Sequence, residues 1–114
     1  MQDIFDQQAT LVRMGQDHGL FREMVAMLLE DSPLLLGQTA AACERDDASE
    51  VRRLAHSLKG MAANFSAGRA VRAAARTEQA AGGENWTAVQ SSLPELREAF
   101  QELCGALKLV ATPE

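Results

Sequence analysis

The stretch AHSLKGMAANF, residues 55–65, places a histidine, a lysine and a glycine close together. A neutral imidazole nitrogen is a nucleophile that can form covalent intermediates, and phosphoryl transfer needs little beyond positioning and charge stabilisation. Lys59, one helical turn after His56, could pair with phosphate oxygens. Gly60 costs a helix about 1 kcal/mol relative to Ala, but it would clear space for a docking protein. These residue types and spacings favour a phosphoryl-accepting histidine.

Hydrophobic periodicity predicts that this stretch is a helix with His56 on its exposed face. Advancing about 100° per residue from Val51 places most apolar residues of the segment within roughly 60° of one line. On the same scale His56 lands at about 140°, close to Lys59, Gly60 and Ala63. A single surface histidine is usually only a solvated residue, so the periodicity alone leaves that alternative open. We interpret the second histidine, His18, as structural.

The charge distribution is uneven along the chain. The formal net charge is −5, which argues against general nucleic-acid binding because neutralising phosphates needs a basic surface. No Asp or Glu occurs between Val51 and Thr77, a segment that holds Arg52, Arg53, Lys59, Arg69, Arg72 and Arg76. The histidine therefore lies in the basic part of an acidic protein, although a solvated face is the alternative interpretation of the arginines.

Length and composition favour one all-α domain covering residues 1–114. The chain has 114 residues, is rich in Ala and Leu, and contains three Pro and no Tyr. Cys43 and Cys104 lack metal-ligand spacing, and we expect core thiols, with no cofactor and no metal bound by this chain. No apolar run approaches the roughly 18 residues of a membrane span, and MQDIFDQQ does not resemble a signal peptide, so we expect a cytoplasmic protein.

Caps and breakers divide the chain into helices with short connections. Asp17, Asp47 and Asn85 are predicted helix caps, with Glu50 completing a partial capping box. Pro33 is expected to end one helix and begin the next, and Pro94 to kink or interrupt the last. The predicted helical segments are residues 3–15, 20–32, 33–45, 48–65, 67–80 and 86–110. Short connections favour antiparallel neighbours, so the simplest architecture is an up-and-down bundle.

The residues 55–60, AHSLKG, followed by Ala62-Ala63-Asn64-Phe65, closely resemble the signature of histidine-containing phosphotransfer (HPt) domains of two-component phosphorelays. The resemblance covers almost the whole chain, since FDQQATLVRMG is similar to the family's first helix and GGENWTAV to the turn into its last. It implies an antiparallel four-helix bundle with a short extra N-terminal helix.

The resemblance also implies a function. His56 would accept a phosphoryl group from the aspartyl phosphate of a receiver domain and pass it to another receiver, with Lys59 near the phosphoryl group and Gly60 opening the surface. The chain would be a carrier and not an enzyme, and the receiver would supply Mg²⁺. We expect Arg52, Arg53, Ala63 and Asn64 to contact the receiver.

Two departures from the family concern the scaffold. The family usually has Gly after the position of Phe65, where this chain has Ser66, so we expect a displaced or rebuilt turn. The following helix carries Ala70, Ala73 and Thr77 where the family tends to have Leu, which predicts thinner packing.

Expected partners are response-regulator receiver domains and a hybrid histidine kinase, with no nucleic acid and no membrane, and we expect a monomer. The alternative function is a helical interaction module that docks receivers without being phosphorylated. The sequence does not distinguish a free-standing shuttle from a domain of a larger kinase.

Overall fold

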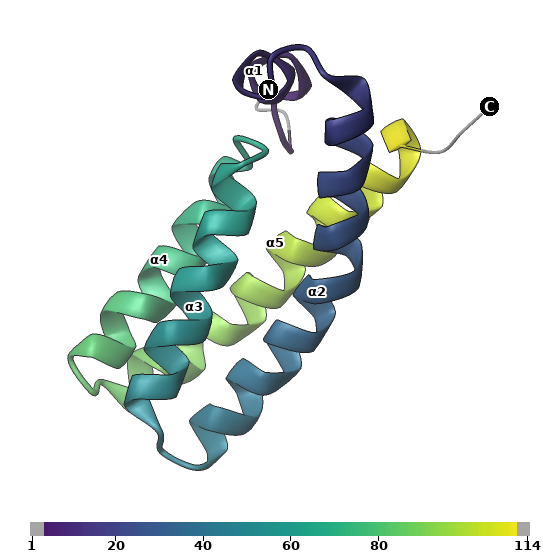
Figure 1. Ribbon diagram of the computed structural model, residues 1–114. Coiled ribbons are helices and arrows are strands. Elements are labelled where there is room, and N and C mark those ends of the chain that lie inside the picture. Colours follow the sequence, from purple (N-terminus) through teal and green to yellow (C-terminus); the bar gives the residue numbers. More distant parts are fainter. Residues whose placement is uncertain (1–3, 112–114) are drawn as a thin grey trace.

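The computed structural model describes residues 4–111, and these residues form five helices and their turns. They are α1 (Gln7–Arg13), α2 (His18–Glu44), α3 (Ala48–Ala63), α4 (Gly68–Gly82) and α5 (Trp86–Ala111). The four long helices run alternately up and down, and the short α1 lies across one end of the bundle (Figure 1). The predicted all-α class, the antiparallel four-helix bundle and the extra N-terminal helix are confirmed.

Four of the five described helices start at short polar caps, whereas α4 follows Ala67 and has no side-chain cap. At each polar cap a side-chain oxygen accepts a hydrogen bond from a backbone N–H of the first turn, which satisfies a donor that has no intrahelical partner. The capping residues are Asp6, Asp17, Asp47 and Asn85. The three caps predicted from the sequence are thus correct. The first helix begins at Gln7 after Asp6, whereas its predicted start at Asp3 lies outside the described residues.

Both internal prolines lie inside continuous helices, which contradicts the predicted break at Pro33 and an interruption at Pro94, whereas a kink at Pro94 stays a prediction. Pro33 lies within α2, so the predicted segments 20–32 and 33–45 are one helix, and Pro94 lies within α5 without ending it. A proline removes one intrahelical hydrogen bond and disfavours helix in the preceding residue. That local cost is overcome in α2 because buried residues on both sides of Pro33, such as Leu28 and Thr39, pack into the bundle.

The bundle core is formed by one face of each long helix. On α3 the predicted apolar stripe is buried at Val51, Leu54, Leu58 and Ala62, whereas Met61 is only half-buried. On α4 the buried side chains are small: Ala70, Ala73, Ala74, Thr77 and Ala81. The buried hydroxyl of Thr77 donates to the carbonyl of Ala73 at 3.1 Å and lies 2.7 Å from the hydroxyl of Ser92. Packing of α4 through small side chains agrees with the prediction and lets α3 and α4 approach closely.

The turn between α3 and α4 has a left-handed residue that is not a glycine. Ser66 has φ 54°, a region that is strained for residues with a side chain. The guanidinium of Arg13 on α1 donates to the carbonyl oxygens of Ala63 and Asn64 and to the hydroxyl of Ser66, at 3.2, 3.1 and 2.6 Å. These hydrogen bonds hold the turn, and α1 covers it (Figure 1). Whether the turn is displaced relative to that of the family stays a prediction.

Candidate functional site

His56 projects from the outer face of α3. Its side chain is 68% exposed, while Ala55 and Leu58 on either side of it are completely buried. The helix is fixed at its start by the Asp47 cap and along its inner face by the buried stripe. The fold therefore holds the position of the imidazole while leaving the ring in contact with solvent, as the periodicity predicted.

A carboxylate from α4 bridges His56 and Lys59. Glu78 Oε2 lies 2.9 Å from His56 Nδ1, and Glu78 Oε1 accepts a hydrogen bond from Lys59 Nζ at 2.6 Å. The Glu78 side chain is only 17% exposed. The cation expected beside the histidine is thus present, but it is already paired.

The bridge determines which imidazole nitrogen can react. The hydrogen bonds from Lys59 and from His56 lower the pKa of Glu78 below its usual value of 4.5, although partial burial opposes the shift. An ionised carboxylate only accepts hydrogen bonds, so Nδ1 of His56 must carry a proton. In the neutral ring Nε2 then keeps its lone pair. The geometry supports a nucleophile at Nε2 held in one tautomer by Glu78.

Gly60 lies one turn beyond His56 on the same exposed face. A Cβ built on Gly60 meets no atom within 4 Å outside its own helix backbone. Packing therefore does not require glycine here, and a mid-helix glycine is unfavourable by about 1 kcal/mol relative to Ala. An exposed mid-helix glycine that packing does not require is expected where an approaching molecule needs space next to the helix.

The four expected docking residues are all exposed, but they occupy different surroundings. Arg52 borders a hollow of about 460 Å³ together with Lys59, Glu78, Gln79 and Gly82. Arg53 is paired with Glu50 on its own helix. Ala63 ends α3, and Asn64 follows it as the C-cap. Arg52 thus lies beside the Lys59–Glu78 pair, whereas the charge of Arg53 is largely compensated. The docking role of all four stays a prediction.

Sequence reasoning missed Glu78, the first acidic residue after the segment that lacks carboxylates. One signal could have found it. A helical hairpin brings together residues at comparable distances from its turn, and both His56 and Glu78 lie two to three helical turns from residues 64–67. A carboxylate at that distance on α4 is therefore a candidate neighbour of the histidine.

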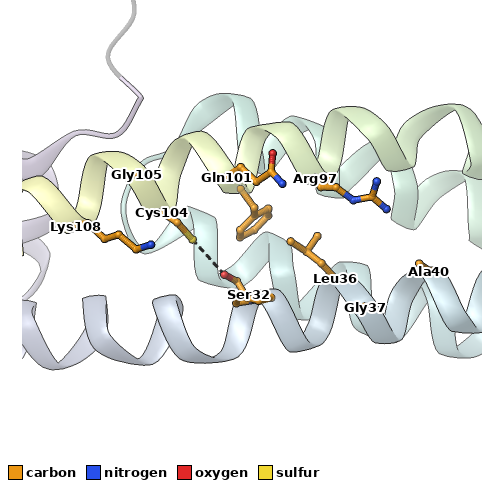
Figure 2. Close-up of a pocket in the computed structure, with 11 residues that line it drawn as sticks. Ser32, Leu36, Gly37, Ala40, Arg97, Gln101, Cys104, Gly105 and Lys108 are labelled. Atoms are coloured by element: carbon orange, nitrogen blue, oxygen red, sulfur yellow. Dashed lines mark hydrogen bonds between the residues drawn. The ribbon is translucent and has the colours of Figure 1, made fainter.

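A separate hollow of about 510 Å³ lies between α2 and α5 and does not include His56. Figure 2 shows Ser32 and Cys104 facing each other in it, with Ser32 Oγ 3.5 Å from Cys104 Sγ. Both cysteines were expected to be core thiols, but only Cys43 is buried, whereas Cys104 is half-buried. Burial raises the pKa of the Cys43 thiol.

Within residues 4–111, no helix is long and apolar enough to cross a membrane. No group of three or more His, Cys, Asp or Glu side chains in that range could hold a metal ion.

Comparisons with known proteins agree with the class of protein that the fold defines, a helical bundle that carries an exposed histidine on one face. The family model of the Hpt domain matches residues 23–106, so this chain belongs to the Hpt domain family. The crystal structure of histidine-containing phosphotransfer protein B from Pseudomonas aeruginosa PAO1 has the same fold, with a TM-score of 0.89, 18% identity, and coverage of 97% of this chain and 96% of that one. No curated protein matches the chain.

Proposed function

We propose that this chain is a phosphorelay intermediate in which His56 accepts a phosphoryl group from the aspartyl phosphate of one receiver domain and passes it to another. The observation that carries the proposal is the exposed imidazole whose Nδ1 is held by Glu78 at 2.9 Å. Membership of the Hpt family supports the general function of phosphotransfer.

In the proposed step, the lone pair of His56 Nε2 attacks the phosphorus atom of the receiver's aspartyl phosphate. The new bond is N–P, and the bond that breaks joins phosphorus to the aspartate oxygen, which leaves as a carboxylate with the bonding electrons. The ring gains positive charge and keeps its proton on Nδ1, next to the Glu78 carboxylate. That carboxylate stabilises the charge where it develops. The reverse step on a second receiver regenerates neutral His56.

In this proposal Lys59 binds the transferred group. Its ammonium has three N–H donors, and Glu78 takes one of them at 2.6 Å. The other two would donate to phosphoryl oxygens, so in this proposal Lys59 stays paired with Glu78 when the phosphoryl group arrives. In this proposal the Mg²⁺ that neutralises the remaining charge comes with the receiver, as does most of the catalytic apparatus. The chain acts as a carrier.

The test is transfer from a phosphorylated receiver of the same genome to the purified chain. We expect radiolabel on the wild type, none on His56→Gln, and wild-type labelling of the control His18→Gln, because His18 lies at the exposed start of α2. Label that persists in His56→Gln would disprove the assignment. Receiver binding without any labelling of the wild type would instead support the alternative, a docking module that is not phosphorylated.

A further inference from the structure

The hollow between α2 and α5 lies across the bundle from the phosphoryl site. Helix α2 packs against α3 and α5, and α4 also packs against α3 and α5, so the α2–α5 face is opposite the α3–α4 face (Figure 1). His56 and Lys59 of α3, with Glu78 of α4, belong to the α3–α4 face. A molecule bound in the hollow would therefore leave His56 open to a partner.

Each of the two walls of this hollow contains a glycine in the middle of a helix. Gly37 of α2 and Gly105 of α5 both line the hollow (Figure 2). A Cβ built on either residue meets no atom within 4 Å outside its own helix backbone. Glycine inside a helix is unfavourable by about 1 kcal/mol relative to Ala, and packing within the described chain requires neither glycine. Two such glycines on one hollow are expected where a bound molecule needs the space.

The lining of the hollow is positively charged, although the protein has a formal net charge of −5. Arg97 and Lys108 of α5 lie at its two ends (Figure 2), and no Asp or Glu is among the described residues that line it. Glu98 and Glu102, which are close to Arg97 in sequence, pair with Arg69, and no ion pair of Arg97 occurs within residues 4–111. A surface with cations and no carboxylate attracts anions, and the planar guanidinium of arginine matches a carboxylate.

Between the two cations the hollow is largely apolar. Its lining there includes Leu36 of α2 and both Phe100 and Cys104 of α5, and a free cysteine packs like a small apolar residue. Arg97 and Lys108 are separated by three turns of one helix, so the hollow extends over roughly 16 Å. Its volume of about 510 Å³ lies in the range of small-molecule sites. The shape and lining suit an elongated apolar chain with an anionic group at one end.

The size and charge of the hollow disfavour two larger occupants. A two-turn helical segment about 10 Å across fills roughly 850 Å³, which exceeds the volume available. A symmetric dimer through this face would bring the cations of two copies together, and like charges repel. An extended alkyl chain needs less space and brings no positive charge.

We propose that the hollow between α2 and α5 binds a free amphipathic carboxylate, with the carboxylate on the Arg97 guanidinium and the alkyl chain along Leu36 and Phe100 toward Cys104. The inference does not depend on the proposed function, because the hollow and His56 lie on opposite faces. A ligand that binds only the folded chain also stabilises it, so the melting temperature should rise with ligand concentration.

The experiment titrates the isotope-labelled protein with dodecanoate, below the concentration at which dodecanoate forms micelles, and follows the backbone amide NMR signals. We expect saturable shifts at residues that line the hollow, such as Gly37, and none around His56. Gly105→Leu fills the hollow and should abolish binding. Arg97→Gln removes the charge-assisted pair and should weaken binding by about tenfold. Arg22→Gln is the matched control, since Arg22 is exposed on α2 and lies outside the hollow.

Binding that is lost in Gly105→Leu, weakened in Arg97→Gln and kept in Arg22→Gln supports the site, provided that circular dichroism shows each variant to be folded. The absence of saturable shifts in the wild type, or equal affinity in all variants, overturns it. Equal binding of dodecyltrimethylammonium, which has the same chain and the opposite charge, overturns the anionic selectivity. Phosphatidylglycerol vesicles that shift the same signals without dodecanoate would assign the hollow to a lipid surface, and shifts caused by protein concentration alone would assign it to a second copy. Either result overturns the proposal of a free ligand, and neither affects the labelling of His56.

Discussion

The Glu78 carboxylate holds the ring of His56 from the neighbouring helix, with 2.9 Å between Oε2 and Nδ1. Its other oxygen accepts from Lys59 at 2.6 Å, so one side chain of α4 orients two residues of α3. The arrangement of His56 and Lys59 therefore depends on the packing of α3 against α4, and the small buried side chains of α4 let these helices approach closely.

Replacing Glu78 by Gln should slow phosphoryl transfer without changing the fold. The amide oxygen can still accept from Nδ1, but it no longer offers a negative charge to the ring as positive charge develops there. Hydrogen bonds to charged groups are about 1 kcal/mol stronger than neutral ones, which corresponds to roughly a fivefold slower step. Rapid-quench transfer from a phosphorylated receiver measures it. Glu84→Gln removes the same charge from an exposed turn residue and should transfer normally; equal rates for both variants would contradict the role of Glu78.

The same carboxylate should make stability depend on acid. Its bonds to Lys59 and His56 lower the pKa of Glu78 in the folded state below the usual 4.5. The stabilisation is therefore complete above about pH 4.5, the value in the unfolded chain, and disappears as the pH falls through the lower folded-state value. Urea unfolding at pH 7 and pH 3 should show that Glu78→Gln loses less stability on acidification than the wild type. An identical loss in both proteins would show that Glu78 does not contribute.

How far the sequence predicted the fold depended on the range of the interactions involved. Caps such as Asp47 bond to the backbone of their own first turn, and the buried stripe of α3 repeats within one helix, so both were predicted correctly. Pro33 was misread because its local cost is outweighed by residues that pack against other helices. Local rules describe the penalty of a proline, whereas tertiary burial determines whether the helix accepts it.

The candidate site divides in the same way. The exposure of His56 could be predicted from the spacing of apolar residues within one helix. Gly60 could be singled out because glycine is unfavourable in the middle of any helix. The partnership with Glu78 depends on how α4 is aligned with α3, which is set by the turn at Ser66 and by packing through small residues. The alignment of α4 with α3 leaves no signal in the sequence of either helix alone, so Glu78 was identified only from the structure.

Gly60 should be dispensable for folding and important for docking. Substitution by Ala meets open space and should stabilise the protein by about 1 kcal/mol, because Ala favours helix. Gly37→Ala and Gly105→Ala are matched controls within α2 and α5, where an added Cβ also meets nothing within 4 Å.

Gly60→Glu should fold but transfer phosphate at least tenfold more slowly, because it adds bulk and negative charge beside His56. Thermal unfolding and transfer assays test both statements, and wild-type transfer by Gly60→Glu would contradict the docking role.

Ser66→Gly should raise the melting temperature. Relief of the left-handed conformation is worth about 1 kcal/mol, equivalent to roughly 4 °C in a domain of this size. Loss of the hydrogen bond from Arg13 to the exposed hydroxyl offsets part of that gain. Ser66→Ala separates the two effects, since it keeps the strained φ and removes the hydroxyl, and it should melt below the wild type. A lower melting temperature for Ser66→Gly would mean that the contact with Arg13 outweighs the strain.

Arg69 should stabilise the bundle without contributing to transfer, although the sequence placed it with the basic residues around His56. Its guanidinium joins the start of α4 to successive turns of α5, with nitrogen–oxygen distances of 2.7 Å to Glu95, 3.3 Å to Glu98 and 3.0 Å to Glu102. In Arg69→Gln the three carboxylates lose their shared cation and repel one another. The melting temperature should fall by a few degrees at low ionic strength, and the deficit should shrink in 0.5 M NaCl because salt screens the repulsion.

Exposed Arg22 of α2 provides the control substitution, Arg22→Gln. A deficit that does not change with salt would indicate lost packing of the arginine side chain, and slower phosphoryl transfer in Arg69→Gln would mean that its charge reaches the site on α3.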